Sequence, residues 1–459
     1  MPSPTTMGPF KYFPLAFNKD GGIVDQSQFA AVIAAVAQGA AAPLTDLIVI
    51  SHGWNNDIPE AEALYTSIFN QVGGVLPLQN PACTAVRSRS VAVVGILWPS
   101  KKFDEASLIP GGAAAMSDGT QEAAQAVDQL SGFLDSPDAT VALARAKALV
   151  PQLSGSIDAR DEYSRLIRAF MPHDANDEEA VIDPSFFTLD GDELLRRLAR
   201  TAPDAAPTSS SSGGGGAVSM GAGSYGAGGG GGAAGLGDWF GKVADGARNL
   251  ANLVTYYQMK NRAGAIGQGG VRDVLTRIRE DRPASGQGAL AIHLVGHSFG
   301  ARLVTAATAG PDGAAPLPVN SLVLLQAAFS HYGFALDYDG THDGYFRRVV
   351  TDPAYVTGVV AITFTAKDKA VGLAYPIASR IARQIAAALG DANDPYGGLG
   401  RNGAQKTPGA RVVTLAAPGS AYGFAARGIY NLDSNAIIGG HSDLAHPEVA
   451  YALISAIAT

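Results

Sequence analysis

The feature that most constrains the fold of this chain is a short apolar segment that runs directly into a glycine-flanked serine. Residues 289–295 (ALAIHLV) have the length and composition of a buried strand, and GHSFG follows at residues 296–300. Residues 301–309 favour a helix, which Gly310 and Pro311 should end. A strand, a Gly-x-Ser-x-Gly turn and a helix in this order are typical of a nucleophile elbow, in which the serine stands on a sharp, strained turn.

The elbow predicts roles for the serine and for the residue after it. Side chains at Gly296 and Gly300 would collide with neighbouring backbone, which accounts for both glycines. Ser298 should present an exposed hydroxyl, and the N–H of Phe299, at the start of the helix, should face the place where an oxyanion forms. Because the chain has 56 glycines, the motif alone can occur by chance, but the strand before it and the helix after it favour the elbow.

Apolar strand-like segments alternate with helical segments over most of the chain. This alternation predicts an α/β fold with a mostly parallel sheet that helices cover on both faces. Pro14 predicts an edge position for the first strand, because proline cannot donate a ladder hydrogen bond. The expected strands are residues 11–17, 46–50, 91–97, 289–295, 322–325, 359–364, 411–415 and part of 428–438, and the expected helices of this part are 28–37, 59–72, 301–309, 377–389 and 447–457.

A long insertion interrupts the alternation. Helical segments follow one another without a strand, and residues 201–237 then form a Gly/Ser-rich tract that cannot bury a core and should be a flexible tether. The chain leaves the sheet at a strand's carboxyl end, so a small helical cap over Ser298 is expected, and a surface insertion remote from the site is the alternative. The expected parts are 1–103 (first part of the core), 104–200 (helical insertion, with helices at 120–134, 139–149, 161–170 and 192–200), 201–237 (tract) and 238–459 (second part of the core).

Composition excludes several classes of function. The net charge is −8 and no basic block stands out, which argues against nucleic acid as a partner. The single cysteine, Cys83, lies in a polar connection and excludes intrachain disulfides and thiolate metal clusters. His293 and His297 have the spacing of a helical metal site, but they fall on a strand and a turn, so no metal is expected. No signal peptide or bilayer-spanning stretch is visible, so a cytoplasmic protein without an integral membrane segment is expected.

Several motifs make the chain resemble the α/β-hydrolase superfamily, and within it the bacterial serine esterase or lipase-like proteins. The resemblance covers about residues 11–103 and 238–459 and leaves the insertion out. The motifs that carry it are VISHGWN at 49–55, LWPS at 97–100, GHSFG at 296–300, AKDKA at 366–370 and GHSDL at 440–444.

The resemblance implies a catalytic triad in the chain order serine, acid, histidine. His441 is the expected base, with His446 as the rival because both precede the last predicted helix. Asp368, just after the predicted strand 359–364, is the expected acid, since catalytic loops collect at the carboxyl ends of parallel strands. The N–H of Trp54 is the expected second oxyanion donor, and His52 should play a structural role. The weaker candidates for the acid are Asp337, Asp343, Asp352 and Asp433.

These features predict a serine hydrolase that cleaves a carboxylic ester through an acyl-enzyme on Ser298. A small-molecule ester or lipid-like compound is the expected substrate, and the mechanism requires no cofactor. An amidase or peptidase would use the same triad, and a non-catalytic scaffold or binding protein could keep the same fold. The acyl chain, the alcohol and the oligomeric state stay open.

Overall fold

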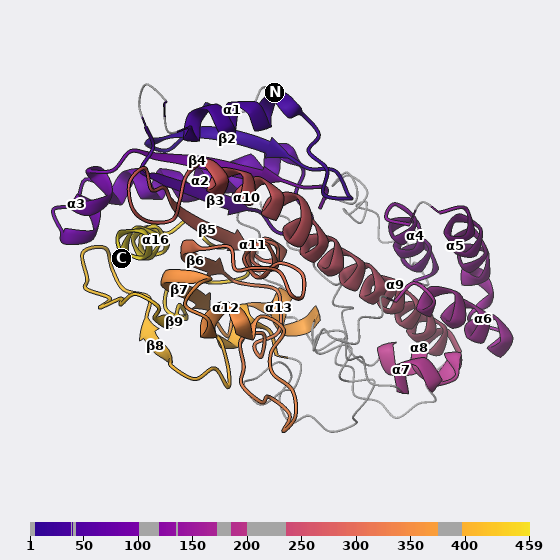
Figure 1. Ribbon diagram of the computed structural model, residues 1–459. Helices are drawn as coiled ribbons and strands as arrows, with labels where there is room; N and C mark the ends of the chain where they lie inside the picture. The colour runs from indigo at the N-terminus through magenta and orange to yellow at the C-terminus, as the bar shows by residue number, and fades with distance from the viewer. Residues whose placement is uncertain are drawn as a thin grey trace.

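A nine-stranded sheet forms the centre of the molecule (Figure 1). The computed structural model describes residues 5–37, 39, 43–100, 119–134, 136–171, 185–199, 236–374 and 397–459. The strands lie in the order β1-β2-β4-β3-β5-β6-β7-β9-β8, and every pairing is parallel except that of β1 with β2. The strands are β1 (Thr6–Met7), β2 (Phe10–Ala16), β3 (Asp46–Ser51), β4 (Val91–Leu97), β5 (Ala291–His297), β6 (Val319–Leu325), β7 (Val356–Phe364), β8 (Ala410–Thr414) and β9 (Ile429–Asp433).

Helices cover both faces of the sheet, as the alternation predicted. Successive residues of a strand point to opposite faces, so Leu47 and Val49 of β3 belong to one apolar core, whereas Ile48 and Ile50 belong to the other. The first core packs beneath α1, α9, α10, α11 and α12, and the second beneath α2, α3 and α16. Their bounds are α1 (Gln26–Val36), α2 (Ile58–Val75), α3 (Pro81–Arg87), α9 (Leu236–Ile266), α10 (Arg272–Asp281), α11 (Phe299–Ala309), α12 (Arg347–Thr351) and α16 (Pro447–Ala458).

The insertion forms a group of helices around one end of α9 (Figure 1). The Tyr163 hydroxyl donates to the Ala247 carbonyl oxygen at 2.9 Å, and the Asn249 side chain donates to the Leu198 carbonyl oxygen at 3.0 Å. Further along, α9 packs on α11 of the core. One helix therefore connects the insertion to the sheet. The insertion contains α4 (Thr120–Ser131), α5 (Pro137–Leu149), η2 (Val150–Gln152), α6 (Ile157–Arg168), α7 (Ser185–Thr188) and α8 (Gly191–Ala199).

The junction between α9 and α10 is a π-helical turn, η3 (Gly267–Val271). A Cβ atom on Gly267 would lie 2.2 Å from the Leu303 carbonyl oxygen, and one on Gly270 would lie 1.9 Å from the Gly21 carbonyl oxygen. Only glycine allows backbones to approach so closely. These contacts fix the core end of α9 against α11 and against the turn that follows β2.

The sequence predictions were wrong in several details. The connection around Cys83 is not irregular: Asn80 caps helix α3 with Pro81 at its first position, and Cys83 is buried. The two-residue strand β1 was not expected, and it makes β2 the second strand from the edge rather than the edge itself. β1 pairs only with Phe10 and Lys11, so among the described residues Pro14 has no strand partner on that side.

Part of the sequence predictions lies outside the described residues, namely the helix expected at 377–389 and nearly all of the tract at 201–237. No helix in the described part of the chain combines the length and the apolar character needed to cross a bilayer. The short helices α13 (Lys369–Ala374) and α15 (Leu399–Asn402) lie near the carboxyl ends of the central strands.

Candidate active site

Ser298 stands between β5 and α11 in a backbone conformation that is rare for a residue with a side chain. Its φ is 56° and its ψ is −124°, and such strained conformations cost on the order of 1–3 kcal/mol. Backbone hydrogen bonds to the next strand and the loop after it hold the turn: the Ser298 N–H donates to the Leu325 carbonyl oxygen, and its own carbonyl oxygen accepts from the Ala328 N–H, both at 3.1 Å. The strand-turn-helix context of the motif is therefore present.

The glycines of the motif allow close backbone packing at this turn. A Cβ atom on Gly296 would lie 2.4 Å from the Ala301 Cα atom, and one on Gly300 would lie 2.2 Å from the Ser51 carbonyl oxygen. A Cβ atom on Gly53 would lie 2.5 Å from the Ser298 Cβ atom. The loop after β3 thus lies directly against the serine.

Three residues from separate loops meet at this turn. The Nε2 atom of His441 lies 2.8 Å from the Ser298 Oγ atom, and its Nδ1 atom lies 2.8 Å from the Asp368 Oδ2 atom. Ser298 is 6% exposed, the Asp368 side chain is 0% exposed, and the His441 side chain is 11% exposed. A carboxylate accepts hydrogen bonds, so Nδ1 carries the proton and Nε2 directs a lone pair toward the serine hydroxyl.

Asp368 is surrounded by donors at the start of α13. Its Oδ1 atom accepts from the Val371 N–H at 3.0 Å, and its Oδ2 atom accepts from the side chain of Gln326 at 3.2 Å as well as from His441. The Arg401 guanidinium donates to the Asp368 carbonyl oxygen at 3.2 Å. Three donors to a buried carboxylate fix its orientation.

The loop that bears Trp54 is held by a buried histidine. The Nε2 atom of His52 accepts from the Trp98 N–H at 3.2 Å, so Nδ1 carries the proton and donates to the Gly53 carbonyl oxygen at 2.9 Å. The Trp98 indole N–H donates in turn to the His52 carbonyl oxygen at 3.0 Å. Burial lowers the pKa of His52 to about 4, which keeps it neutral at pH 7. Hydrogen bonds between the motifs at 49–55 and 97–100 therefore hold the loop that carries Trp54 in place.

The amides expected to form the oxyanion hole belong to residues in segments that adjoin the serine. The Phe299 N–H is the first of α11, and Trp54 follows the glycine that packs on Ser298. Neither amide donates a hydrogen bond to another residue that the structure describes. Both donors are thus available to a ligand at the positive end of the helix dipole.

Tyr256 of α9 is a neighbour of the site that the sequence analysis did not name. Its ring centre lies 5.0 Å from that of Phe299 and 6.2 Å from that of Trp54, and the Trp54 and Phe299 rings are 6.1 Å apart. Tyr256 is also 6% exposed and does belong to the core. The helix that carries the insertion thus contributes one of these three rings beside Ser298.

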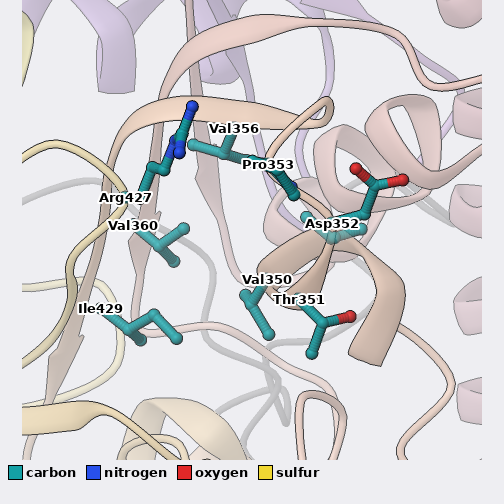
Figure 2. Close-up of a pocket in the computed structure, with 9 residues that line it drawn as sticks. Val350, Thr351, Asp352, Pro353, Val356, Val360, Arg427 and Ile429 are labelled. Carbon is teal, nitrogen blue, oxygen red and sulfur yellow. The ribbon is translucent and has the colours of Figure 1, made fainter.

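The rival residues lie in other surroundings. His446 is the N-cap residue of α16, and its Nε2 atom lies 2.8 Å from Asp443 rather than from the serine. Asp337 and Asp343 are in an exposed loop, and Asp433 accepts hydrogen bonds from Asn435. Asp352 lines a pocket between α12 and the strands β7 and β9, which Arg427 also lines and which contains no residue of the triad (Figure 2).

No group of three histidine, cysteine, aspartate or glutamate side chains suited to a metal ion gathers within the described ranges. His293, which has the helical metal-site spacing with His297, instead bonds Asp46 and Ser321 at the amino ends of the strands.

A scan of protein-family models, a search of curated proteins and a search of solved structures each found no match to this chain.

Proposed function

We propose that this chain is a serine hydrolase with the α/β-hydrolase fold, and that it cleaves carboxylic esters. The observation that carries the proposal is the continuous path from Asp368 through His441 to Ser298, with both contacts at 2.8 Å. The mostly parallel sheet and the strained turn between β5 and α11 support the same assignment.

This path supplies the general base that a serine hydroxyl needs to act as a nucleophile at neutral pH. His441 takes the hydroxyl proton on Nε2 as the Ser298 oxygen attacks the ester carbonyl carbon. Asp368 keeps the imidazole in the required tautomer and stabilises the imidazolium that forms. Negative charge develops on the former carbonyl oxygen, where the amides of Trp54 and Phe299 would donate to it.

The cycle then completes in two steps. The bond between the carbonyl carbon and the alkoxy oxygen breaks, the proton on His441 passes to the departing alcohol, and an ester of Ser298 remains. A water molecule gives a proton to His441 and attacks this acyl-enzyme, which releases the carboxylic acid and restores the serine hydroxyl. No metal or organic cofactor takes part in this chemistry.

The rings of Trp54, Tyr256 and Phe299 favour an apolar acyl group. They lie within 5.0–6.2 Å of one another beside the nucleophile, and burying apolar surface against them contributes about 25 cal/mol per Å². A small-molecule ester or lipid-like substrate fits this environment.

A fluorophosphonate probe tests the proposal, because it reacts only with a serine that a neighbouring base activates. The expected result is one labelled peptide that contains Ser298, and no label in Ser298→Ala. Ser442→Ala is the matched control, since Ser442 neighbours His441 without contacting Ser298 and should label as the wild type does. Ester hydrolysis in Ser298→Ala should fall on the order of a million-fold. Wild-type turnover by a folded Ser298→Ala protein would disprove the proposal.

Paired substrates separate an esterase from an amidase. Short p-nitrophenyl esters should be hydrolysed, and p-nitroanilides with the same acyl groups should not. Comparable turnover of both series would assign the chain to the amidases or peptidases while leaving the triad in place.

A further inference from the structure

Gln326 is a buried polar side chain in contact with the acid of the triad. It follows β6, is 0% exposed, and has a φ of 44°, a conformation that side chains rarely adopt. Its side-chain Nε2 atom lies 3.2 Å from the Asp368 Oδ2 atom and 2.9 Å from the Gly400 carbonyl oxygen. Burying an amide costs free energy unless the amide is hydrogen-bonded, and the strained backbone adds to that cost. The two bonds of Gln326 therefore need an explanation.

The chemistry of its partners fixes the orientation of this amide. A carboxylate oxygen and a carbonyl oxygen both accept, so the atom between them must be the nitrogen, and both of its hydrogens are used. The amide oxygen has no donor within the described part of the chain. Turning the amide over would place three acceptors together without a proton, which excludes the reverse orientation.

The backbone around Gln326 keeps the amide in place. The Gln326 N–H donates to the Thr363 Oγ1 atom at 3.0 Å, and a Cβ atom on Gly400 would lie 2.4 Å from the Gln326 carbonyl carbon. The Gly400 carbonyl oxygen also accepts from the Thr365 N–H at 3.0 Å, on the same loop as Asp368. The amide therefore spans two loops and meets Asp368 at the oxygen that faces His441.

We propose that Gln326 is a positioning residue, which holds the Asp368 carboxylate so that Oδ2 receives the Nδ1 proton of His441. The inference rests on the proposed hydrolase function and adds a fourth side chain to the triad. The Val371 N–H holds Oδ1 and the Gln326 amide holds Oδ2, so the carboxylate can neither rotate nor turn away from the base.

Gln326→Met tests this role, because methionine has nearly the same shape and no donor. We expect kcat to fall about ten- to a hundredfold, the effect of removing a hydrogen bond to a charged group, with little change in KM. Without the Gln326 donor, the negative charge of the Asp368 carboxylate is less compensated, and it stabilises the His441 imidazolium more strongly. The acidic limb of the kcat/KM profile should therefore move to higher pH.

The other polar groups around His441 do not account for such a shift. The neighbouring His297 has its pKa lowered to about 3 by burial and stays neutral. Arg401 contacts the backbone carbonyl oxygen of Asp368 rather than its carboxylate. Thr308→Val is the matched control: it removes one buried side-chain hydrogen bond, to the Val304 carbonyl oxygen within α11, without touching Gln326 or the carboxylate, so the acidic limb should stay at its wild-type position.

A double-mutant cycle separates positioning from packing. If Gln326 acts through Asp368, Gln326→Met should have little further effect in an Asp368→Asn background, whereas independent structural effects would multiply. The inference would be overturned if the effects of Gln326→Met and Asp368→Asn on kcat multiply. It would also be overturned if the acidic limb of Gln326→Met lies at the wild-type pH or below it. If Gln326→Met does not fold, Gln326→Leu also removes the donor, with a shorter apolar side chain. Its kcat should fall by a similar factor, and wild-type turnover in this variant would equally overturn the inference.

The outcome also separates this inference from the proposed function. An inactive Ser298→Ala protein beside fully active Gln326 variants would leave the hydrolase standing and remove Gln326 from it. An active Ser298→Ala protein would remove both.

Discussion

The imidazole of His297 lies against that of His441, with ring centres 5.0 Å apart, and its Nε2 atom lies 3.0 Å from the His441 carbonyl oxygen. A carbonyl oxygen only accepts, so Nε2 carries the proton. Nδ1 is buried and has no partner among the described residues. Burial, and then the neighbouring His441, lower the pKa of His297 to about 3. A neutral histidine beside Ser298 therefore anchors the loop that carries His441.

His297→Phe should impair turnover through this anchor. The substitution keeps a ring in the same space and removes the donor to the His441 carbonyl oxygen, so the base is held less firmly. We expect kcat to fall about tenfold. His342→Phe is the control, because His342 is exposed and pairs with Asp339 on the surface. Equal kcat values for the two variants would mean that the contact does not position His441.

The two histidines of the last loop should respond differently to truncation. His441→Ala should lose nearly as much activity as Ser298→Ala, on the order of a million-fold. His446→Ala should have a mild effect, because its side chain pairs with Asp443 at the start of α16. Asp368→Asn should cost some thousands-fold, roughly the loss expected when the base takes the wrong tautomer. Steady-state rates on a p-nitrophenyl ester measure all three, and a dead His446→Ala protein would reverse the assignment.

Much of the fold follows from local patterns, whereas part of the site does not. Each predicted strand overlaps an observed one. Central strands such as Asp46–Ser51 are apolar runs buried on both faces, whereas the edge strand Ala410–Thr414 is largely exposed. Asn80 and Pro81 are a typical start of a helix, but the segment around Cys83 is polar and was therefore interpreted as a connection. The strand Thr6–Met7 is shorter than any periodicity can reveal.

The elbow and the loops of the triad have motifs, so Ser298, Asp368 and His441 could be named before their contacts were known. Gln326 has no motif: its positive φ and its bond to Asp368 arise only when β6, β7 and the 399–402 turn come together. The contact of Tyr256 with Trp54 is equally invisible to helical periodicity, which gives core and site positions the same spacing.

Gly53→Ala tests the placement of the loop beside the nucleophile. The added Cβ atom would lie 2.5 Å from the Ser298 Cβ atom and 3.1 Å from its Oγ atom, so the loop must move away. The Trp54 amide would move with it, and losing one oxyanion donor costs about a hundred- to a thousandfold in kcat. At Gly440, beside His441, an added Cβ atom meets nothing within 4 Å, so Gly440→Ala is the matched control. Wild-type kcat in Gly53→Ala would exclude Trp54 as a donor.

The buried neutral histidines predict a loss of stability in acid. Burial lowers the pKa of His52 to about 4 and that of His297 to about 3, whereas an unfolded histidine titrates near pH 6.5. Between these values the unfolded chain binds protons that the folded chain does not, so the free energy of unfolding falls as the pH drops below about 6.5. Each histidine should remove on the order of 2 kcal/mol by about pH 4.5.

Urea unfolding at several pH values measures this loss. His297→Phe removes one of the buried histidines and should show a shallower decline than the wild type, while Ser442→Ala, which changes no titratable group, should keep the wild-type slope. A free energy of unfolding that is constant from about pH 6.5 to pH 4.5 would contradict the prediction. Because the unfolded fraction grows in acid, enzyme rates are to be compared only at pH values where the protein is folded.

The last prediction concerns the insertion, whose helices pack on the helix that reaches the site. The Gln258 side chain donates to the Phe170 carbonyl oxygen at 2.6 Å, and Tyr256, on the same turn of α9, contacts Trp54 and Phe299. Helix α6 and the residues that follow it to Phe170 are therefore connected to the rings beside Ser298 through one turn of α9. Whether they also cover the serine stays a prediction, which a comparison of two deletions tests.

Replacing residues 104–200 with a short loop should change the preference between short and long acyl esters, because α9 loses its support and the predicted cap is removed. It should also lower the melting temperature, since the apolar face of α9 around Leu250 and Val254 loses its cover. Shortening residues 209–232, which lie outside the described ranges, is the control. It should leave stability and small-ester turnover nearly unchanged, because each doubling of a flexible loop costs only about 0.6 kcal/mol. A folded protein without residues 104–200 that keeps the wild-type chain-length profile would show that the insertion selects no substrate and is no lid.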